Sequence, residues 1–256
     1  MNMTDIHALL RDKGRLFSDE LGIVAATQPF RWLIAAILFG RRINETIAKR
    51  TYFALARRRL LTPYAIVRAG RDVLIAAMGE GEYVRYDNMT SDYLIGLSER
   101  LIDLYGGNVE AVHARAATPA DLEAALLAFR GIGPVTLSIF LRELRGVWTK
   151  ADPPLTEIEL LAARRLGLTR SRRPRHALVE LKELWRTHAV SGYDFRHLET
   201  ALVRTGLELR RRQRARSLRE QKAIARFTRC APRLTRPASP ARATRRRCVR
   251  RAGRAR

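Results

Sequence analysis

The stretch FRGIGPVTL, residues 129–137, combines the residue types with which a chain binds an anion through its backbone. Gly131 and Gly133 permit backbone conformations that other residues avoid, and they let another molecule approach closely. A helix that begins at Pro134 has backbone N–H groups without helical partners in its first turn, where the positive end of its dipole also lies. Together these groups predict a site for a phosphate, although the same glycine spacing also occurs in plain turns between helices.

Two apolar helices are predicted to hold this turn. Residues 118–129 begin with Thr118 as the N-cap and with proline in the first turn, and residues 134–144 continue as an apolar helix after the glycines. No segment alternates as a half-buried strand does, so we expect an all-α fold of roughly ten helices. The other helices are expected at residues 29–40, 45–60, 63–69, 71–78, 90–107, 156–168, 174–188 and 194–212.

The positive charge of the chain is concentrated near its C-terminal end. The 256 residues carry a net charge of +24, of which +18 lies in residues 210–256 and +6 in the rest. Apolar periodicity ends after residue 206, so we expect residues 207–256 to form a disordered, Arg-rich tail. Such a tail is either an arm that binds nucleic acid or an unselected extension, and the charge of +6 in the body also suits a polyanionic partner.

Both cysteines, Cys230 and Cys248, lie in this tail. The rest of the chain therefore lacks the thiolates that an iron–sulfur cluster, a cysteine-bound zinc or a disulfide would need. The N-terminal segment has no apolar signal region, and the longest apolar run, WLIAAILFG, is too short to span a bilayer. We expect a monomeric, cytoplasmic, nucleoid-associated protein that does not contact membranes.

Residues 29–168 resemble the helix-hairpin-helix (HhH-GPD) superfamily of DNA glycosylases, which includes endonuclease III, AlkA and MutY. The segment LLAFRGIGPVTLSIFLREL is similar to the hairpin of that family, and PFRWLIAAILFGRRINETIAK is similar to its first core helix and minor-groove wedge loop. The resemblance implies a helical fold of two lobes that binds DNA in the cleft between them. One lobe would comprise residues 29–149, with the hairpin at 119–146, and the other residues 1–28 and 150–206.

The resemblance also implies the chemistry. Family members flip the target nucleotide out of the duplex, because its glycosidic bond cannot be reached inside the stack. Asp152 lies 19 residues after Gly133, close to the family spacing, and would be the carboxylate that stabilises positive charge on the sugar and orients a water. Two alternatives remain: Asp152 caps a turn, or Glu157 takes the catalytic position because the residues PPLT delay the next helix.

Two departures from the family narrow the expected activity. Members that also cut the strand carry a nucleophilic lysine where this chain has Val135, so we expect base removal by water without strand cleavage. Lys150 is the only lysine close to Asp152 in the sequence, and it leaves open an abasic-site lyase. The iron–sulfur cysteines of some members are missing. A structural Na⁺ or K⁺ on the hairpin carbonyls is implied, and no metal bound by side chains is expected.

The remaining expected contacts are with DNA and with the flipped base. The charged and amide side chains of the loop GRRIN would contact phosphates or fill the gap left by the flipped base. The alternative is that these side chains are exposed to solvent and contact no DNA. Aromatic side chains near residue 85 and before Asp152 could stack on the base, unless they only cover the core. The expected DNA-binding residues are Gly131, Ile132, Gly133, Val135, Thr136, Arg41, Arg42 and Asn44, and the expected base-pocket residues are Tyr83, Tyr86 and Trp148.

The sequence thus favours one function and leaves two others open. The favoured hypothesis is a base-excision repair enzyme, a monofunctional DNA N-glycosylase that acts on a damaged or mismatched base in double-stranded DNA. The alternatives are a non-catalytic helix-hairpin-helix protein that binds DNA through phosphates, and a lyase that uses a lysine outside the hairpin.

Overall fold

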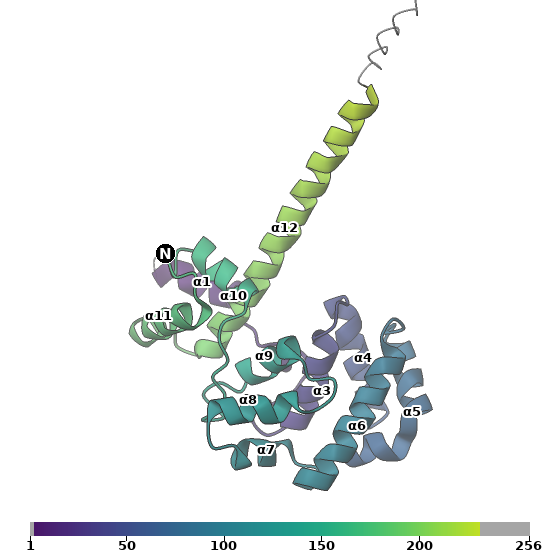
Figure 1. The fold of residues 1–256 in the computed structure, drawn as a ribbon. Coiled ribbons are helices and arrows are strands. Elements are labelled where there is room, and N and C mark those ends of the chain that lie inside the picture. The colour runs from purple at the N-terminus through teal and green to yellow at the C-terminus, as the bar shows by residue number, and fades with distance from the viewer. Residues whose placement is uncertain (1–2, 231–256) are drawn as a thin grey trace, which may run out of the picture. The chain divides into compact units, whose positions relative to one another are not determined.

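The computed structural model describes residues 3–230, and regular secondary structure in this range is helical (Figure 1). The predicted all-α class is therefore confirmed for the described residues. The helices are α1 (Met3–Lys13), α2 (Phe17–Glu20), α3 (Pro29–Phe39), α4 (Glu45–Arg57), α5 (Pro63–Glu80), α6 (Asp87–Tyr105), α7 (Val109–Arg115), α8 (Pro119–Leu127), α9 (Pro134–Arg142), α10 (Glu157–Arg165), α11 (Pro174–Thr187) and α12 (Phe195–Cys230).

Local signals in the sequence set many of the helix ends. Thr118 and Thr156 each form a capping box with the acidic residue three positions later, which satisfies backbone N–H groups at the starts of α8 and α10. Gly106 ends α6 in the left-handed conformation that glycine adopts most readily. Gly70, with φ of 76°, interrupts α5 at the point where the sequence predicts two short helices.

The larger hydrophobic core is built around α3. Eight of the eleven residues of this helix are buried, which explains why its sequence is apolar on nearly every face. Helix α3 contacts α4, α6, α7 and α9, and Figure 1 shows it between α4 and α9. The indole of Trp32 donates a hydrogen bond to the carbonyl oxygen of Phe140 at 3.1 Å, which ties α3 to the helix that follows the glycine turn.

A second core joins the N-terminal helix to the last three helices. Ile6 and Leu10 of α1 pack with buried residues of α10, α11 and α12. At Gly206, α12 passes so close to the backbone of Ile158 that a Cβ atom would overlap its carbonyl oxygen. The segment around Phe17 packs into the larger core instead. The larger core therefore includes residues that precede the first predicted helix, which was expected to begin at residue 29.

Helix α12 continues well past the end that the sequence predicts. The expectation of a disordered tail from residue 207 is wrong for residues 207–230, which are helical. Arg, Leu, Gln, Glu and Ala are all good helix formers, so this segment favours a helix even without an apolar face to bury. Within the described residues, residues 3–211 form one compact unit and residues 212–230 belong to a second. The remainder of the expected tail, residues 231–256, lies outside the described residues.

None of the helices described for residues 3–230 is long and apolar enough to cross a membrane.

Candidate DNA-binding pocket

The turn between α8 and α9 needs glycine at one of its two glycine positions. Gly131 has a φ of 99°, which other residues rarely adopt. A Cβ atom added there would lie 2.7 Å from the Cβ atom of Tyr93 on α6. Gly133, by contrast, has a φ of −102°, and a Cβ atom there would meet no other atom within 4 Å. The two glycines therefore have different roles, although their spacing in the sequence makes them look equivalent.

This difference gives a matched pair of substitutions. Gly131→Ala is expected to lower the free energy of unfolding by about 1–3 kcal/mol, because it forces a strained φ and presses on Tyr93. Gly133→Ala should change the free energy far less, because its backbone is extended and its surroundings are open. Urea denaturation of both variants measures the difference. Equal losses of stability would contradict the geometry of the turn.

The start of α9 presents free backbone donors. Gly133 is the N-cap of α9 and provides no side-chain hydrogen bond, so the N–H groups of Val135 and Thr136 have no capping acceptor in the described part of the chain. The positive end of the helix dipole lies at the same place. The side chain of Val135 is 60% exposed, whereas those of Ile132 and Thr136 are buried. Of these expected DNA contacts, Ile132 and Thr136 can offer only backbone atoms.

The loop after α3 packs directly against this turn. A Cβ atom on Gly40 would overlap the hydroxyl oxygen of Thr136, so the two segments touch. The guanidinium of Arg41 lies 5.0 Å from the ring centre of Tyr93, and that of Arg130, in the hairpin, lies 5.3 Å from the same ring. One aromatic ring thus fixes an arginine from each loop.

The other two expected contacts in this loop differ in their structural roles. Arg42 is exposed. Asn44 is the N-cap of α4, and its side-chain oxygen accepts a hydrogen bond from the backbone N–H of Thr46 at 2.9 Å. The sequence suggested a DNA contact for Asn44, and the structure gives it a capping role as well.

A pocket of about 710 Å³ lies where the loop after α3, the start of α9, the start of α10 and the middle of α12 meet. Its wall contains two phenylalanines whose ring centres are 6.0 Å apart. It also contains four arginines and two carboxylates, so both anions and aromatic groups find partners there. The residues that carry these functions are Phe17, Phe39, Arg41, Arg142, Arg210, Arg211, Glu45 and Glu157.

The two carboxylates of the pocket differ in their partners. Glu45 forms an ion pair with Lys49 at 2.6 Å. Glu157 is the first residue of α10, is exposed, and forms no ion pair with any described residue. The capping box of Thr156 and Glu159 uses Glu159 to hold the start of the helix. Glu157 is therefore the carboxylate of the pocket that remains available to a ligand.

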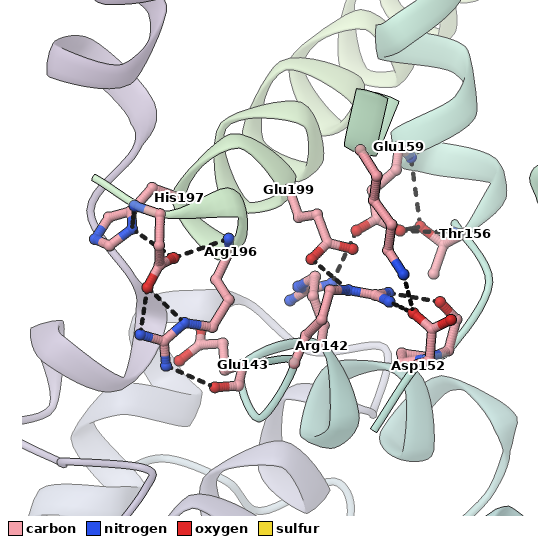
Figure 2. A network of polar contacts seen from close by, with 12 residues as sticks. Arg142, Glu143, Asp152, Thr156, Glu159, Arg196, His197 and Glu199 are labelled. Atoms are coloured by element: carbon pink, nitrogen blue, oxygen red, sulfur yellow. Dashed lines mark hydrogen bonds and ion pairs between the residues drawn. The ribbon is translucent and has the colours of Figure 1, made fainter. Parts of the chain in front are cut away.

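Asp152 lies in a different environment and does not line the pocket. Figure 2 shows Asp152 within a network of polar contacts. Its carboxylate forms an ion pair with Arg145, and Lys182 lies 2.6 Å from the same carboxylate oxygen. Arg145 also donates a hydrogen bond to the carbonyl oxygen of Pro153 at 2.6 Å and to Glu199 at 2.9 Å. The carboxylate of Asp152 thus neutralises two cations and holds the segment that precedes α10.

Buried charges near this ion pair link the helices of the two cores. Burial raises the pKa of Glu199 to about 7, and the neighbouring Arg145 opposes that rise. Glu143 accepts hydrogen bonds from the backbone N–H groups of Phe17 at 2.9 Å and Ser18 at 3.0 Å, while burial raises the pKa of its carboxyl group. An unpaired charge in these buried surroundings would destabilise the fold, so the network fixes the positions of α9, α10 and α12 relative to one another.

The predicted base-pocket aromatics all lie elsewhere. Tyr83 is fully buried, its hydroxyl donates to the carbonyl oxygen of Leu38 at 3.3 Å, and burial raises its pKa to about 12. Tyr86 packs against Tyr83, with ring centres 6.1 Å apart. Trp148 is buried and stacks on His113 at 4.8 Å. None of the three lines the pocket, because each ring is used to pack the larger core.

Lys150 does not line the pocket either. Its ammonium group donates a hydrogen bond to the carbonyl oxygen of His113 at 3.1 Å. No lysine is among the described residues that line the pocket.

Sequence reasoning missed the aromatic wall of the pocket. Phe39 ends the apolar helix α3, and its position next to the GRRIN loop could have marked it. Phe17 belongs to a short helix that no periodic pattern predicts, and only the tertiary fold brings it to the pocket. The guanidinium of Arg204 lies 4.4 Å from the centre of the Phe17 ring.

Metal binding was expected only at the hairpin backbone. Within the described residues, no group of three or more His, Cys, Asp or Glu side chains could hold a metal ion. The N–H of Ile132 donates to the carbonyl oxygen of Phe129 at 3.1 Å and closes a turn. The carbonyl oxygens of this turn are the groups that would hold a monovalent cation, and that cation stays a prediction.

The comparisons with known proteins agree with this architecture at the level of fold. No protein-family model matches the sequence, and no curated protein is significantly similar to it. Among solved structures, the chain is similar to the 3-methyladenine DNA glycosylase MagIII of H. pylori, which was solved bound to 1,N6-ethenoadenine. The TM-score is 0.52 at 14% identity, and the match covers 83% of this chain and 99% of that chain. The chain therefore shares its overall fold with the H. pylori 3-methyladenine DNA glycosylase.

Proposed function

We propose that this protein is a base-excision repair glycosylase that hydrolyses the N-glycosidic bond of a damaged or mismatched base flipped out of double-stranded DNA. The main support is the pocket in which the phosphate-binding turn, the GRRIN loop and the exposed carboxylate of Glu157 meet, within a fold shared with a DNA glycosylase. Its volume of about 710 Å³ is in the range of pockets that take a small ligand.

The turn and the arginines would bind the DNA backbone. The free N–H groups of Val135 and Thr136 at the start of α9 suit a phosphate oxygen, which needs no side-chain charge there. Arg41, Arg210 and Arg211 line the same pocket and would pair with neighbouring phosphates. These contacts position the duplex without reading its sequence.

We assign the catalytic carboxylate to Glu157 in place of Asp152. Cleavage of the glycosidic bond builds positive charge on the sugar, and a nearby carboxylate stabilises that charge and orients the attacking water. Glu157 lines the pocket and has no counter-ion among the described residues, whereas Asp152 is paired with Arg145 and Lys182. Phe39, which is partly buried and lines the pocket, would hold the flipped base by stacking.

We further propose that the enzyme is monofunctional. Val135 occupies the hairpin position of the family lysine and projects an apolar side chain at the pocket. Water is then the nucleophile, and the product is an abasic site in an intact strand. Borohydride should trap no covalent adduct between the protein and DNA.

An excision screen tests the proposal. Purified protein is incubated with duplexes that each carry one alkylated, oxidised, deaminated or mismatched base, and abasic sites are revealed by alkaline cleavage. Release of a base from at least one duplex, with the strand intact before alkali, is the expected result. Duplex binding with no base released from any duplex would overturn the proposal in favour of a non-catalytic DNA-binding protein.

A further inference from the structure

The side chains of α12 from Arg212 to Lys222 are not part of a hydrophobic core. From Arg212 to Lys222, every side chain is exposed, including Leu218, which is 53% exposed. These residues belong to the second compact unit, apart from the unit that contains the pocket. The match to the H. pylori glycosylase covers nearly all of that protein and 83% of this one, so this chain has residues beyond the shared fold.

The charges on this segment are arranged as a broad basic surface. From Arg212 to Lys222 there are five cations and one acidic residue, Glu220, which pairs with Arg216 at 2.9 Å. At the helical rotation of about 100° per residue, these five cations spread over an arc of about 200°. The remaining sector holds Gln213, Ser217, Glu220 and Gln221.

Many of these cations repel one another along the helix. Like charges spaced three or four residues apart lie side by side on a helix and destabilise it by a few tenths of a kcal/mol per pair. Arg212 and Arg216 form such a pair, as do Arg216 and Arg219, and Arg219 and Lys222. A polyanion that neutralises these charges would remove the repulsion, so binding and helix stability are coupled.

The chemistry of the segment fits a nucleic acid better than a membrane. A helix that lies in a membrane surface needs an apolar face opposite its charges, and the described side chains from Arg212 to Lys222 include one large apolar residue, Leu218. Duplex DNA presents regularly spaced phosphates and demands no apolar face.

We propose that the segment from Arg212 to Lys222, the basic helix, is a second DNA-binding element that neutralises duplex phosphates without reading sequence. The inference rests on the DNA partner of the proposed function, but not on base excision. Binding of DNA replaces the repulsion between its cations with attraction to phosphates and so stabilises the helix.

Salt-dependent binding of full-length protein to a short undamaged duplex tests this. The variant Arg212→Gln/Arg214→Gln/Arg219→Gln removes three charges and keeps the pair between Arg216 and Glu220. The matched control Arg68→Gln/Arg172→Gln/Arg175→Gln removes three exposed charges from the compact unit. Neutralised phosphates each contribute about 0.9 to the slope of log affinity against log salt, so the basic-helix variant should lower that slope by about 2.7. The control should change it by clearly less.

Circular dichroism provides a second measurement. Adding duplex should raise the temperature at which the helix signal of the natural protein is lost, and raise it less in the basic-helix variant. Equal salt slopes for the two variants would overturn the inference. So would a loss of binding to phosphatidylserine vesicles with DNA binding unchanged. If the natural protein binds no duplex, the proposed function fails as well, whereas binding without base excision leaves this inference standing.

Discussion

Replacement of Glu157 by glutamine is expected to slow base release by about 10²–10⁴-fold, the usual contribution of a positioned acid or base. The amide keeps the size of the side chain but removes the negative charge that would face the sugar. Glu157 is exposed at the first position of α10, and the capping box of Thr156 and Glu159 stays intact, so the variant should fold normally. Single-turnover kinetics on a duplex identified in the excision screen measure the effect.

Asp152→Asn is the matched control. It makes the same chemical change five residues earlier, on a carboxylate that is paired with Arg145 and Lys182 outside the pocket. Base release should stay within a few-fold of the natural protein once folded protein is counted. If Asp152→Asn abolishes release while Glu157→Gln does not, the assignment from family spacing is right and ours is wrong.

The largest expected loss of stability follows from removing Arg145. Arg145→Met should lower the free energy of unfolding by about 3–5 kcal/mol at neutral pH or above, because it leaves the buried carboxylate of Glu199 without its counter-ion. The substitution also removes the hydrogen bond to Pro153 and the ion pair with Asp152. Urea denaturation at about pH 5 and about pH 8 measures the loss.

The loss should be larger at the higher pH. The pKa of Glu199 is about 7 in the folded protein and 4.5 in the reference state, so the folded protein binds more protons between these values. The protonated carboxyl group of Glu199 therefore favours the folded state at low pH. This contribution to the free energy of unfolding disappears as the pH rises through about 7. Without Arg145, the attraction that lowers this pKa is lost, and charging Glu199 costs more. A loss that is equal at both pH values would contradict this account.

The surface pair of Arg186 and Glu183 provides the control. These residues lie 2.6 Å apart on α11 and are 75% and 60% exposed. Arg186→Met removes a charge pair of similar geometry from solvent, where water and salt screen it. It should change stability far less than Arg145→Met at either pH.

Much of the fold could be predicted because its helix ends are set by local chemistry. The capping boxes at Thr118 and Thr156 and the break at Gly70 depend on residues a few positions apart. Helix α7 was not predicted from the sequence; only two of its seven residues, Val109 and Val112, are buried. Helix α12 was predicted too short, because helix propensity carries it past the residues that bury an apolar face.

The candidate site was predictable only in part. The glycine turn and the alternative of Glu157 follow from the sequence, because both depend on where a helix begins. Pro153 and Pro154 delay α10, so spacing from the hairpin alone points to Asp152 while the helix starts at Glu157. The aromatic wall depends on Phe17 and Phe39, which are far apart in the chain and meet only in the tertiary fold.

The shared ring of Tyr93 has a consequence for affinity. Arg41 and Arg130 both pack on this ring, and Gly40 touches Thr136. The positions of the two loops relative to each other are therefore fixed in the protein without DNA. The entropic cost of ordering the two loops is incurred when the protein folds, and not when it binds a ligand. In the proposed complex with DNA, a phosphate bound at one loop would hold the next phosphate near the other loop at a high effective concentration, as in a bivalent ligand with a rigid linker.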